Sequence, residues 1–137
     1  MELKKFKEGK RSLYHSFLAE KSDAIPPAPF AVLLPAYSEQ EVSTAAEMTP
    51  TLLESGCIEF CCIGSSAEKL HDLIDEIIED RDMFSIVTTF HSDVEDACDY
   101  FLLAAGGGTP SLWAFTAQHP PIAKRLMALI DDAATNV

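Results

Sequence analysis

The sequence predicts a three-layer α/β domain of Rossmann-like or flavodoxin-like type, with about four mostly parallel strands flanked by helices and an N-terminal helix before them. Two observations lead to this expectation. Short, almost wholly apolar runs recur along the chain, as in strands that are buried on both faces of a parallel sheet. Amphipathic segments with helical spacing separate these runs, and such alternation is typical of parallel strands joined by right-handed crossovers.

Length and composition favour one folded domain. The chain has 137 residues, of which 47% are hydrophobic and 23% are charged, and these values are ordinary for a globular protein. No apolar run approaches the roughly 20 residues of a membrane span. The N-terminus lacks the apolar stretch of a secretory signal, so we expect a cytoplasmic protein that does not enter a membrane.

The first 29 residues are predicted to form a helical segment and a linker, followed by a single α/β domain over residues 30–137. A short helix is expected near residues 10–20, because apolar residues there have helical spacing: Leu13, Tyr14, Phe17 and Leu18. A proline-rich stretch then fixes backbone angles and removes hydrogen-bond donors, which ends any helix. Residues 22–29 are therefore interpreted as a linker onto the core.

Four apolar runs are interpreted as the strands of the domain. They cover residues 30–36, 57–63, 83–89 and 111–115. The first is almost wholly apolar and follows turn residues, which is typical of a strand buried on both faces. The last is interpreted as a fourth strand at an edge of the sheet.

Amphipathic helices are expected between these strands and after the last of them. In the first helix, Glu41 lies three residues after a serine, as in a capping box, and Pro50 implies a kink or a restart. The second covers residues 68–79, with its apolar residues on one face. The residues expected at the starts of the first, third and last helices are Ser38, Ser92 or Asp93, and Pro120 or Pro121.

The four cysteines are expected to be buried thiols, because each lies in an apolar run or on the apolar face of a helix: Cys57, Cys61, Cys62 and Cys98. Their spacing suggests no disulfide framework, and no second pair of Cys or His with zinc-like spacing follows. We therefore expect neither a metal site nor a cofactor.

The net charge of −12 is unevenly distributed. Residues 1–21 contain six Lys and Arg against three Glu, whereas residues 22–137 contain four basic and nineteen acidic residues. A negative field repels nucleic acids and anionic lipids and attracts cationic partners, so nucleic-acid binding by the body of the protein is disfavoured. The acidity is also explained by a need for solubility alone.

Three segments in the middle of the chain carry a further signal: GCIEFCCIGSS at 56–66, EKLHDLIDE at 68–76 and IVTTFHSDVEDACDYFL at 86–102. Together they resemble a small bacterial family of uncharacterised α/β domains. The resemblance covers about half the chain, roughly residues 56–102, and it implies a Rossmann-like fold. It implies no activity, because the family carries only a descriptive label.

The loops that follow the predicted strands contain the candidate ligand-binding residues. In open α/β sheets, ligands bind at the carboxyl ends of the strands, which here are followed by Tyr37 and by the turn Gly64, Ser65 and Ser66. That turn leads into a helix, whose N-terminal N–H groups could bind an anion such as a phosphate. It lacks both the GxGxxG spacing and the lysine of a P-loop, so an ordinary helix cap is the competing interpretation.

Two pairs of residues are candidates for catalysis. His91 and Asp93 follow the third strand, where a general base could reach a substrate, although Asp93 could simply cap a helix. His71 and Asp75 share a helix face with Glu79, and these three could hold a divalent cation. The adjacent His71 and Asp72 also resemble part of the HD phosphohydrolase signature, but its other ligands are missing. A solvated acidic helix face explains the same residues.

These observations leave two functions open. The first is a non-catalytic acidic interaction module that engages a protein partner or a second copy of itself, as immunity proteins, antitoxins and regulatory subunits do. The alternative is a small enzyme or ligand-binding domain, in which strand-end residues hold a phosphate-bearing or nucleotide-like ligand. The absence of a GxSxG, HExxH or CxxC signature favours the first.

Overall fold

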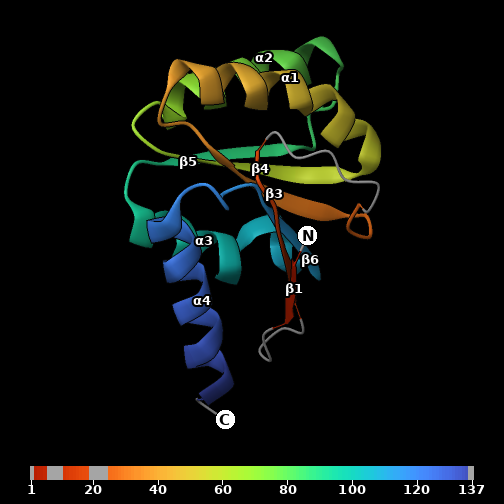
Figure 1. Cartoon of the computed structure of the whole chain (residues 1–137). Helices are drawn as coiled ribbons and strands as arrows, with labels where there is room; N and C mark the ends of the chain where they lie inside the picture. Colours follow the sequence, from red (N-terminus) through yellow and green to blue (C-terminus); the bar gives the residue numbers. More distant parts are fainter. Residues whose placement is uncertain (1, 6–10, 19–24, 136–137) are drawn as a thin grey trace.

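A sheet of five parallel strands, extended at one edge by an antiparallel strand, forms the centre of the molecule (Figure 1). This computed structural model describes residues 2–5, 11–18 and 25–135. Within these residues the strand order is β1-β2-β6-β3-β4-β5. The strands are β1 (Glu2–Lys5), β2 (Ser12–His15), β3 (Phe30–Pro35), β4 (Cys57–Ile63), β5 (Val87–His91) and β6 (Ser111–Ala114). Only the β1–β2 pair is antiparallel among them.

Helices cover both faces of the sheet. One face carries α1 (Glu39–Ser55) and α2 (Ala67–Asp80), and the other carries α3 (Val94–Leu103), the short 3₁₀ helix η2 (Ala105–Gly108) and α4 (Pro120–Thr135) (Figure 1). The predicted three-layer α/β architecture of flavodoxin/Rossmann-like type is therefore confirmed. Among the described residues, no helix combines the length and the apolar character needed to cross a membrane.

The core strand β3 is buried along its whole length and serves both apolar layers. Its side chains alternate: Phe30, Val32 and Leu34 pack with α1 and α2, whereas Ala31 and Leu33 pack with α3 and α4. Burying one such large side chain contributes about 1.5–3 kcal/mol. The apolar run that predicted this strand is thus explained by contacts on its two faces.

Local signals in the sequence define where the helices begin and end. The Oγ of Ser38 accepts a hydrogen bond from the N–H of Glu41 at 3.2 Å, which confirms the predicted cap of α1. The helix ends at Gly56, whose left-handed backbone (φ 107°) suits glycine. It continues through Pro50 as one helix, so no restart occurs there. Asp93 caps α3 as predicted.

The predicted N-terminal helix is wrong in its described part. Residues 12–15 form β2, which pairs in parallel with β6 and antiparallel with β1. Leu13 packs into the layer of α3 and α4, and its neighbour Tyr14 packs against the layer of α1 and α2, as successive residues of a strand do. Residues 19–24, which belong to the predicted helix and linker, lie outside the described part of the chain.

Two further strand predictions need correction. Residues 111–115 were expected at an edge, but β6 lies between β2 and β3 in the sheet. The third strand was expected over residues 83–89, but β5 begins only at Val87 and continues to His91. A turn precedes it, in which Asp82 has a positive φ of 54° and the N–H of Met83 donates to the carbonyl of Ile78.

All four cysteines are buried and free of disulfides, as predicted. Burial raises the pKa of every one of these thiols, in the case of Cys98 to about 12. They therefore stay protonated near neutral pH and behave as small apolar side chains.

A polar network is buried at the amino end of the strands, on the face covered by α3. The carboxylate of Glu59 in β4, only 4% exposed, accepts hydrogen bonds from the hydroxyl of Tyr100 at 2.6 Å and the N–H of Gly106 at 2.9 Å. Thr89 and Cys61 donate to the same group, at 3.3 and 3.5 Å. Four donors from separate parts of the chain thus converge on one side chain.

Arg11 completes this region from the other side of η2. Its guanidinium is 3% exposed and donates to three backbone carbonyls at the end of α3 and around η2: those of Leu102, Ala105 and Thr109. Carbonyls at the end of a helix lack the N–H donors of a following turn, and Arg11 supplies donors in their place. Arg11 and Glu59 together fix the path of the chain from α3 into β6.

Replacing Glu59 by glutamine tests this network. The amide can accept only through one oxygen, so the donors of Tyr100 and Gly106 cannot both be satisfied. We expect the free energy of unfolding, measured by urea denaturation, to fall by about 3 kcal/mol. The control is Glu76→Gln on the exposed face of α2, for which we expect a change below about 0.5 kcal/mol. Equal effects of the two substitutions would contradict the role given to Glu59.

Candidate functional site

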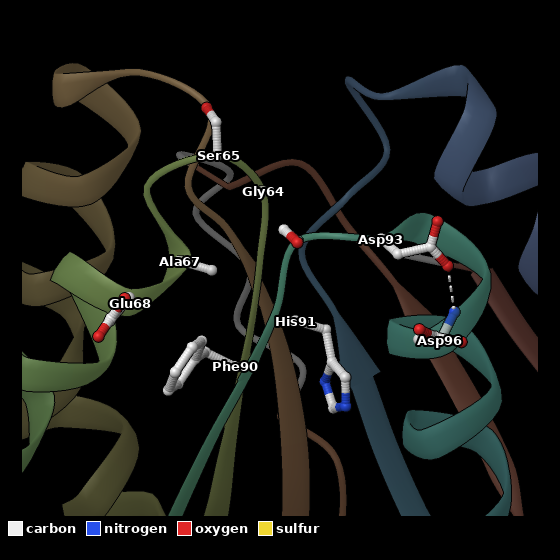
Figure 2. A pocket seen from close by; sticks show the side chains of 9 residues that line it. Gly64, Ser65, Ala67, Glu68, Phe90, His91, Asp93 and Asp96 are labelled. Carbon is white, nitrogen blue, oxygen red and sulfur yellow. Dashed lines mark hydrogen bonds between the residues drawn. The ribbon is translucent and has the colours of Figure 1, made fainter.

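A cleft of about 350 Å³ opens at the carboxyl ends of β4 and β5 (Figure 2). The turn after β4 contributes Gly64 and Ser65, β5 contributes its last residue His91, and the segment after β5 contributes Asp93. The structure thus brings together loops that the sequence analysis expected at one edge of the sheet. The edge is shared because parallel strands all point their carboxyl ends the same way.

The turn after β4 is held tightly by the protein itself. A Cβ atom at Gly64 would lie 2.7 Å from the carbonyl oxygen of Ala36, and the φ of this residue is 131°, so only glycine fits. The N–H groups of Gly64, Ser66 and Ala67 donate to backbone carbonyls. These three donors are therefore committed within the fold rather than aimed at a ligand. Ser66 is the N-cap residue of α2, although its side chain accepts no capping hydrogen bond.

The cleft is acidic. Glu68, Asp93 and Asp96 line it, and all three are exposed. The carboxylate of Asp93 accepts from the N–H of Asp96 at 2.9 Å, the bond dashed in Figure 2, so it serves as the helix cap. The ring of His91 lies 5.4 Å from that of Tyr100, centroid to centroid. This charge distribution repels phosphate groups and attracts cations.

His71 and Asp75 lie outside the cleft, on α2. The imidazole of His71 lies 3.1 Å from Asp72 and 3.6 Å from Asp75, and its ring packs at 4.9 Å against that of Phe90. Among the described residues, no group of three or more His, Cys, Asp or Glu side chains could hold a metal ion. The predicted cation site with Glu79 is thus not assembled there.

Tyr37 belongs to a second cluster, which lies between the ends of β3 and β6. The chain leaves β3 toward α1 on one face and leaves β6 toward α4 on the other, so this is the switch point of the sheet. The N–H of Tyr37 donates to Glu41 Oε1 at 2.8 Å, and its ring lies 4.8 Å from that of His119. Glu41 Oε2 lies 2.5 Å from His119 Nε2 and 3.4 Å from Gln118 Nε2.

The environment of Glu41 favours its ionised form. Burial by itself raises the pKa of this carboxyl, but the hydrogen bonds from Tyr37, His119 and Gln118 outweigh it, and the pKa is lowered overall. Burial also raises the pKa of the Tyr37 phenol, which stays neutral. Glu41 therefore joins the first turn of α1 to the loop before α4 through a charge-assisted bond.

The sequence analysis missed Glu41, Gln118 and His119 as a cluster. Glu41 was assigned only to a capping box, and no candidate residue was predicted in the loop after residue 115. With β6 in the centre of the sheet, that loop lies at the switch point instead. A groove of about 300 Å³ adjoins the cluster, with Leu18 and Gln118 in its wall.

The outer edge of β5 is another feature that the sequence analysis did not identify. This strand pairs with β4 on one side and ends the sheet on the other within the described residues. Large apolar side chains lie exposed on it and just before it: Phe84 is 73% exposed, Val87 46% and Phe90 43%. Apolar residues grouped at an open strand edge mark an interaction surface more often than scattered ones do.

The fold and these surfaces define a class: a parallel α/β domain of flavodoxin/Rossmann-like type with an acidic carboxyl edge. Residues 14–133 match the family described as "Domain of unknown function (DUF7684)". The chain belongs to this family, since the match covers most of its length. A comparison with curated proteins found no match, and a comparison with solved structures found none either.

The lowered pKa of Glu41 predicts a pH-dependent contribution to stability. Because the folded state favours the carboxylate, this contribution is present above the ordinary pKa of 4.5 and is lost as the pH falls through the lower, folded value. We expect Glu41→Gln to reduce the free energy of unfolding by about 1–2 kcal/mol at pH 7. The deficit relative to wild type should shrink below pH 4.5 in denaturation curves recorded at several pH values.

Glu39→Gln is the matched control, because Glu39 lies in the same helical turn with its side chain 95% exposed. It should change stability little at any pH. If Glu41→Gln lowered the free energy of unfolding by the same amount at pH 7 and at pH 3.5, the stabilising effect of the Glu41 hydrogen bonds would not depend on its charge.

Proposed function

We propose that this chain is a non-catalytic, acidic interaction module of the cytoplasm, which binds a protein partner along the free edge of β5. The main observation behind this proposal is that the outer edge of β5 is unpaired within the described residues and carries exposed apolar side chains. Val87 to His91 present one unpaired side within the described residues, with exposed Val87 and Phe90 on the strand. Unpaired N–H and C=O groups at a sheet edge are a template for an added strand.

The composition of β5 supports this use. Natural proteins protect open edges with charged residues, proline or bulges, and the sequence of β5, VTTFH, contains none of Lys, Arg, Asp, Glu or Pro. The opposite edge of the parallel strands is covered, because β1 pairs with β2 there. The sheet then ends at β1, whose sequence ELKK contains three charged residues, whereas the other terminal strand, β5, contains none, so β5 is the terminal strand better suited to a partner.

The candidate catalytic side chains have structural partners, which favours binding over catalysis. Asp93 caps α3, His91 packs against Tyr100, and His71 lies between two aspartates and Phe90. A general base needs a free nitrogen or oxygen aimed at a substrate, and the polar contacts of Asp93 and His71 engage theirs. These contacts instead order the segments on either side of β5.

Selection of peptides from a random library tests the proposal. We expect the recovered binders to slow hydrogen exchange of the amides of residues 87–91, because an added strand pairs with that backbone. The double variant Val87→Ser/Phe90→Ser should weaken their binding by at least about tenfold, since it removes the apolar contacts. Affinity can be measured by fluorescence anisotropy.

Ile25→Ser is the control, since Ile25 is 52% exposed but precedes β3 instead of lying on β5. It should leave peptide affinity unchanged. Binders that protect other amides, or that tolerate the loss of both Val87 and Phe90, would overturn the proposal.

The alternative function is a small enzyme or ligand-binding domain for a phosphate-bearing or nucleotide-like ligand. Its support is the cleft between β4 and β5, which lies at the edge where such ligands bind. The three carboxylates of that cleft and the committed N–H groups of its turn weigh against it.

A thermal-shift panel of nucleotides, sugar phosphates and divalent cations separates the two functions. A ligand that binds only the folded state raises its stability by about 2.7 kcal/mol at a hundred times its dissociation constant. We expect no member of the panel to raise the melting temperature. A reproducible rise that His91→Ala abolishes would favour the alternative function instead.

A further inference from the structure

The acidic charge of the chain is concentrated around β5. Between residues 67 and 103, which run from α2 through β5 to the end of α3, there are eleven Asp and Glu against two Lys and Arg. This quarter of the chain therefore carries a charge of −9 out of a net −12. The strand itself is uncharged, so the open edge is an apolar strip with carboxylates around it.

Carboxylates lie close to the exposed ring of Phe90 on the α2 side of the sheet. The imidazole of His71 contacts this ring and both neighbouring carboxylates, those of Asp72 and Asp75. The side chains of these aspartates are 71% and 44% exposed. A cation placed over Phe90 would meet an aromatic face, with two carboxylates on the far side of the His71 imidazole to attract it.

The two sides of β5 differ in chemistry. Thr89 and His91 point toward α3, because they contact Glu59 and Tyr100, and Val87 shares their side through the period of the strand. Phe90 points toward α2, where it contacts His71. A strand added beside β5 would therefore meet exposed apolar Val87 on one side and the acidic surroundings of Phe90 on the other.

We propose that the partner segment is an extended strand in which Lys or Arg alternates with apolar residues. This inference rests on the proposed function and adds the chemistry of the partner. The basic side chains lie over Phe90, Asp72 and Asp75, and the apolar ones pack beside Val87. Alternation follows because successive side chains of a strand point to opposite faces of the sheet.

Charge also separates this partner from a second copy paired through the same edge. Two β5 strands related by a twofold axis perpendicular to the sheet would place the acidic α2 helices of both copies on one face, next to each other. Like charges in such a contact cost free energy, whereas a basic strand neutralises them. A partner of opposite charge is therefore favoured over β5–β5 pairing.

Four peptides of about ten residues test the inference. In the first three peptides, Val alternates with Arg, with Gln or with Glu. The fourth peptide has the same composition as the Arg peptide, but all its Arg residues lie at one end. We expect the alternating Arg peptide to bind at least about tenfold more tightly than the Gln peptide in low salt, and the advantage to shrink as salt is added. The Glu peptide should bind more weakly than the Gln peptide. The peptide with all its Arg at one end should bind more weakly than the alternating Arg peptide.

The double variant Asp72→Asn/Asp75→Asn should remove most of the advantage of the Arg peptide and leave the affinity of the Gln peptide unchanged. Glu39→Gln/Glu47→Gln, which removes two exposed carboxylates from α1, is the matched control and should leave the advantage intact. All binding should protect the amides of residues 87–91 from exchange.

The outcomes distinguish this inference from the function on which it rests. If the Gln and Arg peptides bind β5 equally, the partner is not basic, but strand addition stands. If no peptide protects β5 from exchange, both proposals fail. If sedimentation shows self-association that Val87→Ser/Phe90→Ser abolishes, the occupant is a second copy, and the inference of a separate basic partner is overturned.

Discussion

The buried contacts of Glu59 and Arg11 are the constraint on which the arrangement of the sheet depends. They hold the turn at η2, where the chain stops moving outward along the sheet and returns to its centre as β6. Burying a charged group costs several kcal/mol unless hydrogen bonds compensate it, and both groups have three or more partners. The return of β6 creates the switch point, and it leaves β5 at the far edge.

The sequence predicted the elements whose signals are local. Each of these signals occupies only a few consecutive residues, so it could be recognised without knowledge of the rest of the fold. They are the wholly apolar run of β3, the capping serine of α1 and the capping aspartate of α3. The strand β2 and the central place of β6 in the sheet could not be predicted in this way. The apolar residues around β2 have helical spacing, and its partner β6 lies about a hundred residues away in the chain. Pairing over such a separation leaves no local trace.

The candidate sites also differ in whether local sequence could predict them. The turn at Gly64 and the residues His91 and Asp93 follow strands that are consecutive in the chain and adjacent in the sheet, so their convergence could be predicted. The cluster of Glu41 and His119 depends on the position of β6, and the exposed strip on β5 depends on which strand ends the sheet. Those facts come from the strand order, which hydrophobic patterning does not determine.

The central position of β6 also bears on how the chain folds during synthesis. Strand β3, which is buried along its whole length, obtains one of its two neighbours only when residues 111–114 have been made. Until then the backbone N–H and C=O groups on that side are unpaired and the side chains of the strand are apolar, which is the condition that favours aggregation of incomplete chains. Contacts this distant in sequence form slowly, since the intervening chain must first be ordered. Completion of the sheet is therefore a late event, set by the last fifth of the sequence.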